Sequence, residues 1–175
     1  MANSRALQVI VGIALAAYGL SCFAGLLHGI HRFGVLGSLR VQGPLAWLVT
    51  FGLPYRGVLI AGAFGSGVGY LGMLLSGAAL VLQRRALVPS AVSMLAAWAL
   101  LELLSIPGDV AMAFGGARLT GPAQGTILQF ATPSLVRLTR LVAAGTGFLT
   151  AVIIVALSLW LRRAQRVWPG AHGND

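Results

Sequence analysis

One acidic side chain lies inside a long apolar segment, and it is the first residue to which chemistry can be assigned. Glu102 is the only acidic residue within a predicted membrane span. An ionisable group in hydrocarbon is costly, so it marks a functional site by default. Arg137 and Arg140 should lie at the same level, at the start of the last span. Three roles stay open for Glu102: an interhelical ion pair with these arginines, a proton-carrying or ligand-binding carboxylate, or a side chain that snorkels to the interface.

Two histidines are the next candidates. His28 and His31 stand at the end of the first apolar segment, at positions i and i+3, so they share one helical face. They could bind a metal with Glu102 or Asp109 as further ligands. A haem b would need histidines on two different spans, and no other predicted span has one.

A glycine-rich stretch in the second apolar segment contains Gly67-x-Gly69-x-x-Gly72, which matches the dinucleotide fingerprint by spelling. That fingerprint needs a strand before it and a helix that opens at it, and this stretch lies midway through an apolar segment. We therefore interpret it as a packing face, because small residues four apart let helix backbones approach closely in lipid. The face could pack within the chain or against another subunit, and its residues are Gly65, Gly69, Gly72 and Ser76.

Other catalytic patterns are missing from the sequence. There is no Gly-x-Ser-x-Gly motif, and no histidine lies within the later spans to serve as a base. The single cysteine, Cys22, excludes both a disulfide within the chain and a cysteine-based zinc site. These observations favour a protein that is not an enzyme, and they call for no cofactor.

The composition shows which environment must hold these residues. Apolar residues make up 58% of the 175 residues and charged residues 9%, against about 25% charged in a typical soluble domain. The net charge is +9, and all twelve basic residues are arginines. They stand singly or in pairs at the ends of apolar segments, which is typical of membrane anchoring and not of nucleic-acid binding.

Four apolar segments are long enough to cross a hydrocarbon core of about 30 Å. We expect one membrane domain over residues 1–168, followed by a disordered tail over 169–175. Pro107-Gly108 should end the third helix, and Thr132-Pro133 reads as the N-cap and first residue of the fourth. The predicted spans are 6–30, 57–82, 86–105 and 137–161.

Two longer connections join these spans, over residues 31–56 and 106–132. Residues 44–54 are mostly apolar and bounded by prolines, and they are too short to span, so we expect them to lie in the membrane interface or to dip into it. No internal repeat is visible, so the inverted-repeat signature of many transporters is missing.

The arginines also predict orientation. An even number of spans places both termini on one side, and the arginines divide evenly, six on that side and six in the two long loops. The first six lie in far fewer residues and close to the helix ends, where the charge bias counts, so we expect both termini to be cytoplasmic. They are Arg5, Arg84, Arg85, Arg162, Arg163 and Arg166.

Together these patterns predict an all-α, integral membrane four-helix bundle with two longer non-cytoplasmic loops, located in a bacterial plasma membrane. The leading hypothesis for its function is an accessory or scaffolding subunit that packs against other membrane proteins or itself, with the lipid bilayer as its surroundings. The first alternative is a transporter or channel for a small solute or proton that uses Glu102. The second is a metal-binding or redox subunit that uses His28 and His31.

Overall fold

The computed structural model describes residues 2–38, 55–114 and 133–168, and over these residues the chain is all-helical. Four long helices follow one another, and a short 3-10 turn, η3 (Gln165–Val167), closes the last of them. The four are α1 (Ala2–Ser38), α2 (Tyr55–Leu82), α3 (Leu87–Phe114) and α4 (Pro133–Ala164).

Each helix is long and apolar enough to cross a membrane, which confirms the prediction of an all-helical chain with four candidate spans. Helices suit this setting because every backbone amide finds its partner inside the same segment. Large apolar side chains point outward from the helices, as expected where the solvent is lipid. Examples are Ile10, Phe64, Phe148 and Leu149, each more than half exposed.

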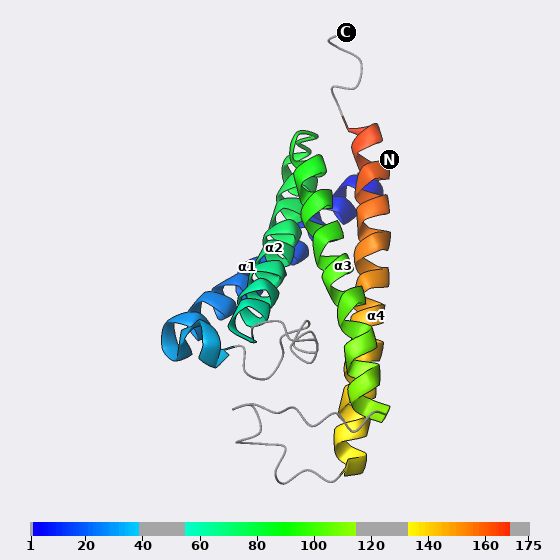
Figure 1. The fold of residues 1–175 in the computed structure, drawn as a ribbon. Helices are drawn as coiled ribbons and strands as arrows, with labels where there is room; N and C mark the ends of the chain where they lie inside the picture. The colour runs from blue at the N-terminus through cyan, green and yellow to red at the C-terminus, as the bar shows by residue number, and fades with distance from the viewer. Residues whose placement is uncertain (1, 39–54, 115–132, 169–175) are drawn as a thin grey trace.

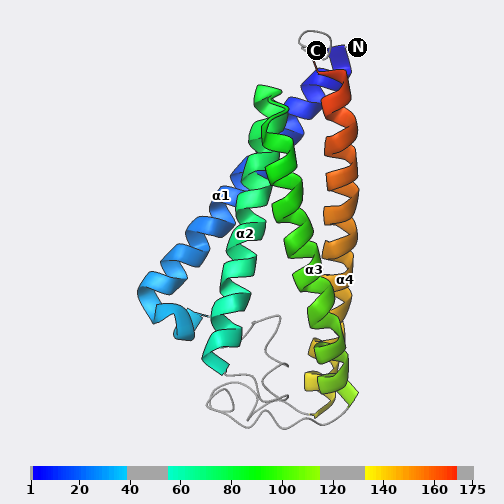
Figure 2. The same cartoon turned by 45° about the horizontal axis from the view of Figure 1, so that its top comes forward.

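The helices pack in chain order: α1 on α2, α2 on α3, and α3 on α4. α3 and α4 lie side by side along most of their length, whereas α1 crosses α2 at a steep angle (Figures 1 and 2). The α1–α2 and α3–α4 pairs converge at the end that carries both chain ends and the α2–α3 turn. They diverge toward the opposite end.

The convergent end is held by a buried cluster and by two side-chain bonds. Trp168, just beyond η3, is 2% exposed and packs with residues of α2, α3 and α4 that include Leu80, Val88 and Leu161. Its indole Nε1 donates to Gln8 Oε1 of α1 at 3.2 Å. Its carbonyl oxygen accepts from Arg85 Nη2 of the α2–α3 turn. We call this three-way junction of Gln8, Arg85 and Trp168 the terminal clasp.

The predicted end of the third helix is wrong, because α3 continues through Pro107 to Phe114. Proline is tolerated in membrane helices where neighbouring groups satisfy the backbone around it. Pro107 is exposed, so its ring turns away from the packed face, and Ser105 Oγ donates to the Glu102 carbonyl oxygen at 2.7 Å in the turn before it. The continuation matters for function because it brings Asp109 into the helix.

The predicted end of the first helix is also wrong, since α1 extends to Ser38 and not to residue 30. Its candidate span ends at Arg32, so hydropathy located the membrane segment but not the helix that continues beyond it. α4 begins at Pro133, as the proline predicts. The predicted interfacial segment 44–54 and tail 169–175, and most of the 106–132 connection, lie outside the described residues.

The α2–α3 turn begins at a residue in an unusual backbone conformation. Gln83 has φ 51°, in the left-handed region, and the Arg84 amide donates to the Ala79 carbonyl oxygen at 3.2 Å. This is the Schellman arrangement that ends many helices, in which glycine usually takes the left-handed position. A side chain there costs conformational energy because its Cβ crowds the following carbonyl oxygen.

Replacing Gln83 with Gly should therefore stabilise the protein. We expect a gain of roughly 1 kcal/mol, which relief of left-handed strain provides. The check is the thermal unfolding midpoint in mild detergent, compared with Ala97→Gly, which places glycine at an exposed position inside α3 and should lower the midpoint. An unchanged or lower midpoint for Gln83→Gly would show that the turn carries no strain.

Candidate functional site

The polar side chains of α3 gather on one helical face. Trp98, Glu102, Ser105 and Asp109 stand at i, i+4, i+7 and i+11, a spacing that keeps them in line along the helix. This face packs on α4, whose facing residues follow the alternating three- and four-residue spacing of a coiled-coil seam. The seam on α4 consists of Arg140, Ala144, Gly147, Ala151, Ile154 and Leu161.

Glu102 is half-buried between α3 and α4. Its Oε1 accepts a hydrogen bond from Trp98 Nε1 at 2.9 Å. On the α4 side stands Gly147, where an added Cβ would lie 3.4 Å from Glu102 Oε2 and 3.7 Å from Ser105 Oγ. The glycine therefore leaves room for the carboxylate where the two helices are close. The carboxyl group of Glu102 is held by one neutral donor, the Trp98 indole.

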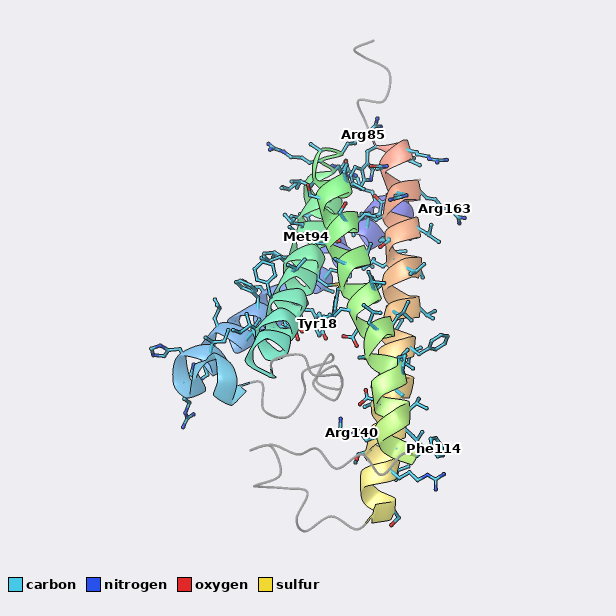
Figure 3. The ribbon with its side chains drawn as sticks, viewed as in Figure 1. Tyr18, Arg85, Met94, Phe114, Arg140 and Arg163 are labelled. Carbon is cyan, nitrogen blue, oxygen red and sulfur yellow. The ribbon has the colours of Figure 1, made fainter. Side chains whose placement is uncertain are left out.

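The ion pair that the sequence predicted for Glu102 forms at Asp109 instead. Arg140 Nη1 lies 3.1 Å from Asp109 Oδ1, and the two side chains are 25% and 15% exposed. Arg137 instead stacks its guanidinium over the Phe114 ring, 4.3 Å from the centroid. Figure 3 places Arg140 and Phe114 together at the end of the molecule away from the chain ends. An arginine therefore does bridge α4 to α3, but through Asp109, about two helical turns beyond Glu102.

Breaking this pair should destabilise the α3–α4 contact. Arg140→Ala leaves a partly buried carboxylate without its charged partner, and a hydrogen bond between charged groups contributes roughly 1.5–3 kcal/mol. Asp109→Ala should cost a similar amount, and the double variant should cost less than the sum of the two. The measurement is a double-mutant cycle, in which the thermal unfolding of wild type and the three variants is compared in detergent. Fully additive losses would contradict a direct interaction.

Trp98 is fixed by α2. A Cβ added to Gly69 would lie 2.7 Å from Trp98 Cε3 and closer still to other ring atoms, so the indole packs directly on the glycine. Tyr70 meets the same indole edge-on, with ring centroids 5.6 Å apart. The donor that holds Glu102 is therefore itself positioned by two residues of α2.

The glycine face of α2 packs within the chain. A Cβ at Gly65 would lie 2.5 Å from Leu101 Cδ2, and one at Gly72 would lie 3.0 Å from Met94 Cβ, both on α3. Ser76, also named from the sequence, is fully buried and donates to the Gly72 carbonyl oxygen of its own helix at 2.7 Å. α3 thus covers the residues that the sequence offered as a partner surface.

The two histidines lie away from this network. His28 and His31 are exposed on α1. Among the residues that the structure describes, no group of three or more His, Cys, Asp or Glu side chains could hold a metal ion. The predicted additional ligands, Glu102 and Asp109, have Trp98 and Arg140 as partners instead.

Sequence reasoning missed three features of this site. The Asp109–Arg140 pair was hidden because Pro107 was expected to end the helix. Gly147 was not identified, although the seam spacing from Arg140 to Leu161 would have placed it on the α3 side. Tyr70 carried no pattern that related it to Trp98, since the two residues meet only through the angle between α2 and α3.

Comparisons with known proteins give no family. No protein-family model matches the chain, and neither the curated proteins nor the solved structures contain a match. Function therefore has to be argued from the site itself.

Proposed function

We propose that this protein is a small membrane transporter or channel in which Glu102 binds the proton or small cationic solute that crosses. The observation that supports the proposal is the separation of roles between the two carboxylates. Arg140 neutralises Asp109, whereas Glu102 is held by the neutral indole of Trp98. An intramembrane carboxylate with a neutral partner must bind a proton or cation when it is not exposed to water, because an isolated charge in hydrocarbon is costly.

The surroundings of Glu102 suit such an exchange. Trp98 and Ser105 provide polar atoms close to the carboxylate, and Gly147 leaves space on its α4 side. The Asp109–Arg140 pair lies further along the same α3–α4 contact and adds a second polar position at membrane depth. The polar positions therefore lie along α3 from the middle of the helix toward its C-terminal end.

The test is flux through the purified protein. Wild-type protein reconstituted into vesicles should carry a proton or small-cation current down an imposed gradient, above that of empty vesicles. A dye for internal pH detects protons, and a solid-supported membrane electrode detects alkali and small organic cations. Vesicles that hold folded protein and carry none of these ions would contradict the proposal.

We propose further that the convergent end faces the cytoplasm of a bacterial cell and that the divergent end faces outward. The density of arginine around the chain ends supports this orientation, because cytoplasmic flanks carry the positive excess. Green fluorescent protein fused to the C-terminus should then fluoresce in cells, and alkaline phosphatase fused at the same place should stay inactive. The reverse pattern would invert the orientation.

A second candidate function is an accessory subunit of a membrane complex, and the incomplete closure of the helices favours it. α1 packs mainly on α2 and α4 mainly on α3, so the two pairs separate away from the terminal clasp. An accessory role would place another subunit against the exposed apolar faces of α1 or α4. Purification in mild detergent through a C-terminal tag should then recover a membrane protein at fixed stoichiometry, and recovery of this chain alone would count against an accessory role.

A further inference from the structure

The convergent end of the molecule gathers arginine side chains from three separate parts of the sequence. The terminal clasp joins the start of α1, the α2–α3 turn and the end of α4, so the arginines beside each of these segments meet at one end. Figure 3 shows Arg85 and Arg163 together there. The exposed members of this arginine collar are Arg5, Arg84, Arg162, Arg163 and Arg166.

The protein has almost nothing with which to neutralise this collar. The whole sequence contains three acidic residues, Glu102, Asp109 and Asp175. The first lies beside Trp98 and the second beside Arg140, both away from the collar. Asp175 is the only acidic side chain that remains for five exposed guanidinium groups. Their counter-charges must therefore come from outside the chain.

The collar is also held in place. Trp168 and Leu161 are buried in the cluster that joins α2, α3 and α4, and Arg162 and Arg163 follow directly on that packed turn. Arg85 fixes the turn by donating to the Trp168 carbonyl, and its own Nε is buried without a hydrogen-bond partner among the described residues. Arginines on an ordered backbone lose less freedom when they bind an anion than arginines of a flexible tail do.

We propose that the arginine collar is a binding surface for the headgroups of anionic phospholipids. Guanidinium groups match phosphate oxygens with paired, parallel hydrogen bonds. The collar surrounds the ends of membrane-spanning helices, where lipid phosphates lie, and basic groups at that level are attracted to anionic leaflets. Val167, the most exposed large apolar side chain of the described residues at 81%, stands beside these arginines at the end of the chain's last helix.

The experiment measures lipid binding to the full-length protein in mild detergent. Short-chain phosphatidylglycerol and phosphatidylcholine are titrated separately, and binding is followed by native mass spectrometry and by the thermal unfolding midpoint. The test variant is Arg162→Gln/Arg163→Gln/Arg166→Gln. The control, Arg32→Gln/Arg40→Gln/Arg118→Gln, removes the same charge from the rest of the chain. The test and control variants must each elute as a single folded species. If the glutamine test variant does not fold, Arg162→Lys/Arg163→Lys/Arg166→Lys changes the same three residues and keeps their charge.

Wild-type protein should retain phosphatidylglycerol in preference to phosphatidylcholine, and the preference should weaken as salt rises. The test variant should lose about tenfold in apparent affinity for phosphatidylglycerol, while the control keeps most of it. The lysine variant should bind more weakly than wild type but better than the glutamine variant. The proposal would be overturned if wild type retained both lipids equally, or if the control lost as much affinity for phosphatidylglycerol as the test variant. It would also be overturned if inorganic phosphate alone raised the thermal unfolding midpoint as much as phosphatidylglycerol does.

Discussion

Glu102→Gln should reduce ion flux through the reconstituted protein to the level of empty vesicles. The amide has nearly the same shape and can still accept the Trp98 hydrogen bond through its oxygen, so the packing of α3 on α4 should persist. It cannot take up a proton or balance a cation. Loss of the group that binds the ion should lower the rate at least about tenfold.

Two further variants separate chemistry from structure. Glu102→Asp keeps the carboxylate but withdraws it by one methylene from Trp98, so it should retain part of the flux. Ser158→Ala is the matched control, because the Ser158 hydroxyl donates to the Ile154 carbonyl within α4 and takes no part in the site. Wild-type flux in Glu102→Gln would remove this carboxylate from the pathway.

Gly69→Leu should destabilise the protein strongly. Even the Cβ would overlap the Trp98 ring, and the remaining side chain has no space to enter. Either the indole or the α2 backbone must move, at a cost at or above the upper end of the usual range for overpacking, about 3 kcal/mol. We expect a much lower thermal midpoint, and loss of flux with it because Trp98 positions Glu102.

The chain offers matched controls for this substitution. Nothing lies within 4 Å of a Cβ added at Gly145 of α4 or at Gly25 of α1. Leucine at either position should leave the midpoint unchanged or raise it slightly, because leucine favours helix more than glycine does. If Gly145→Leu and Gly69→Leu unfold at the same temperature, the contact between Gly69 and Trp98 does not support the fold.

The sequence predicts the number of helices well and their ends less well. The apolar segments located all four spans because hydropathy reports directly on the lipid environment. Helix ends depend on backbone bonding, which hydropathy does not report. α1 therefore continues beyond residue 30 to Ser38, and α3 continues through Pro107, which is exposed.

The site was predictable in its residue types and not in its pairing. Glu102 and its alignment with Trp98 and Ser105 follow from helical spacing alone. The choice between Glu102 and Asp109 as the partner of Arg140 depends on the register of α3 on α4, which places Gly147 beside Glu102. The glycine face of α2 was recognised, but its occupant was not, because small residues indicate close approach without identifying the partner.

The most direct test of the central claim observes Glu102 itself. It is the only glutamate in the sequence, so protein labelled with ¹³C at the glutamate side-chain carboxyl gives one resonance for this residue. The assignment is checked with the Glu102→Gln variant, whose spectrum should lack that carboxylate resonance. In lipid nanodiscs, the wild-type resonance should shift reversibly with pH or with addition of the transported cation. A wild-type resonance that stays fixed under every condition in which the protein remains folded would contradict exchange at Glu102.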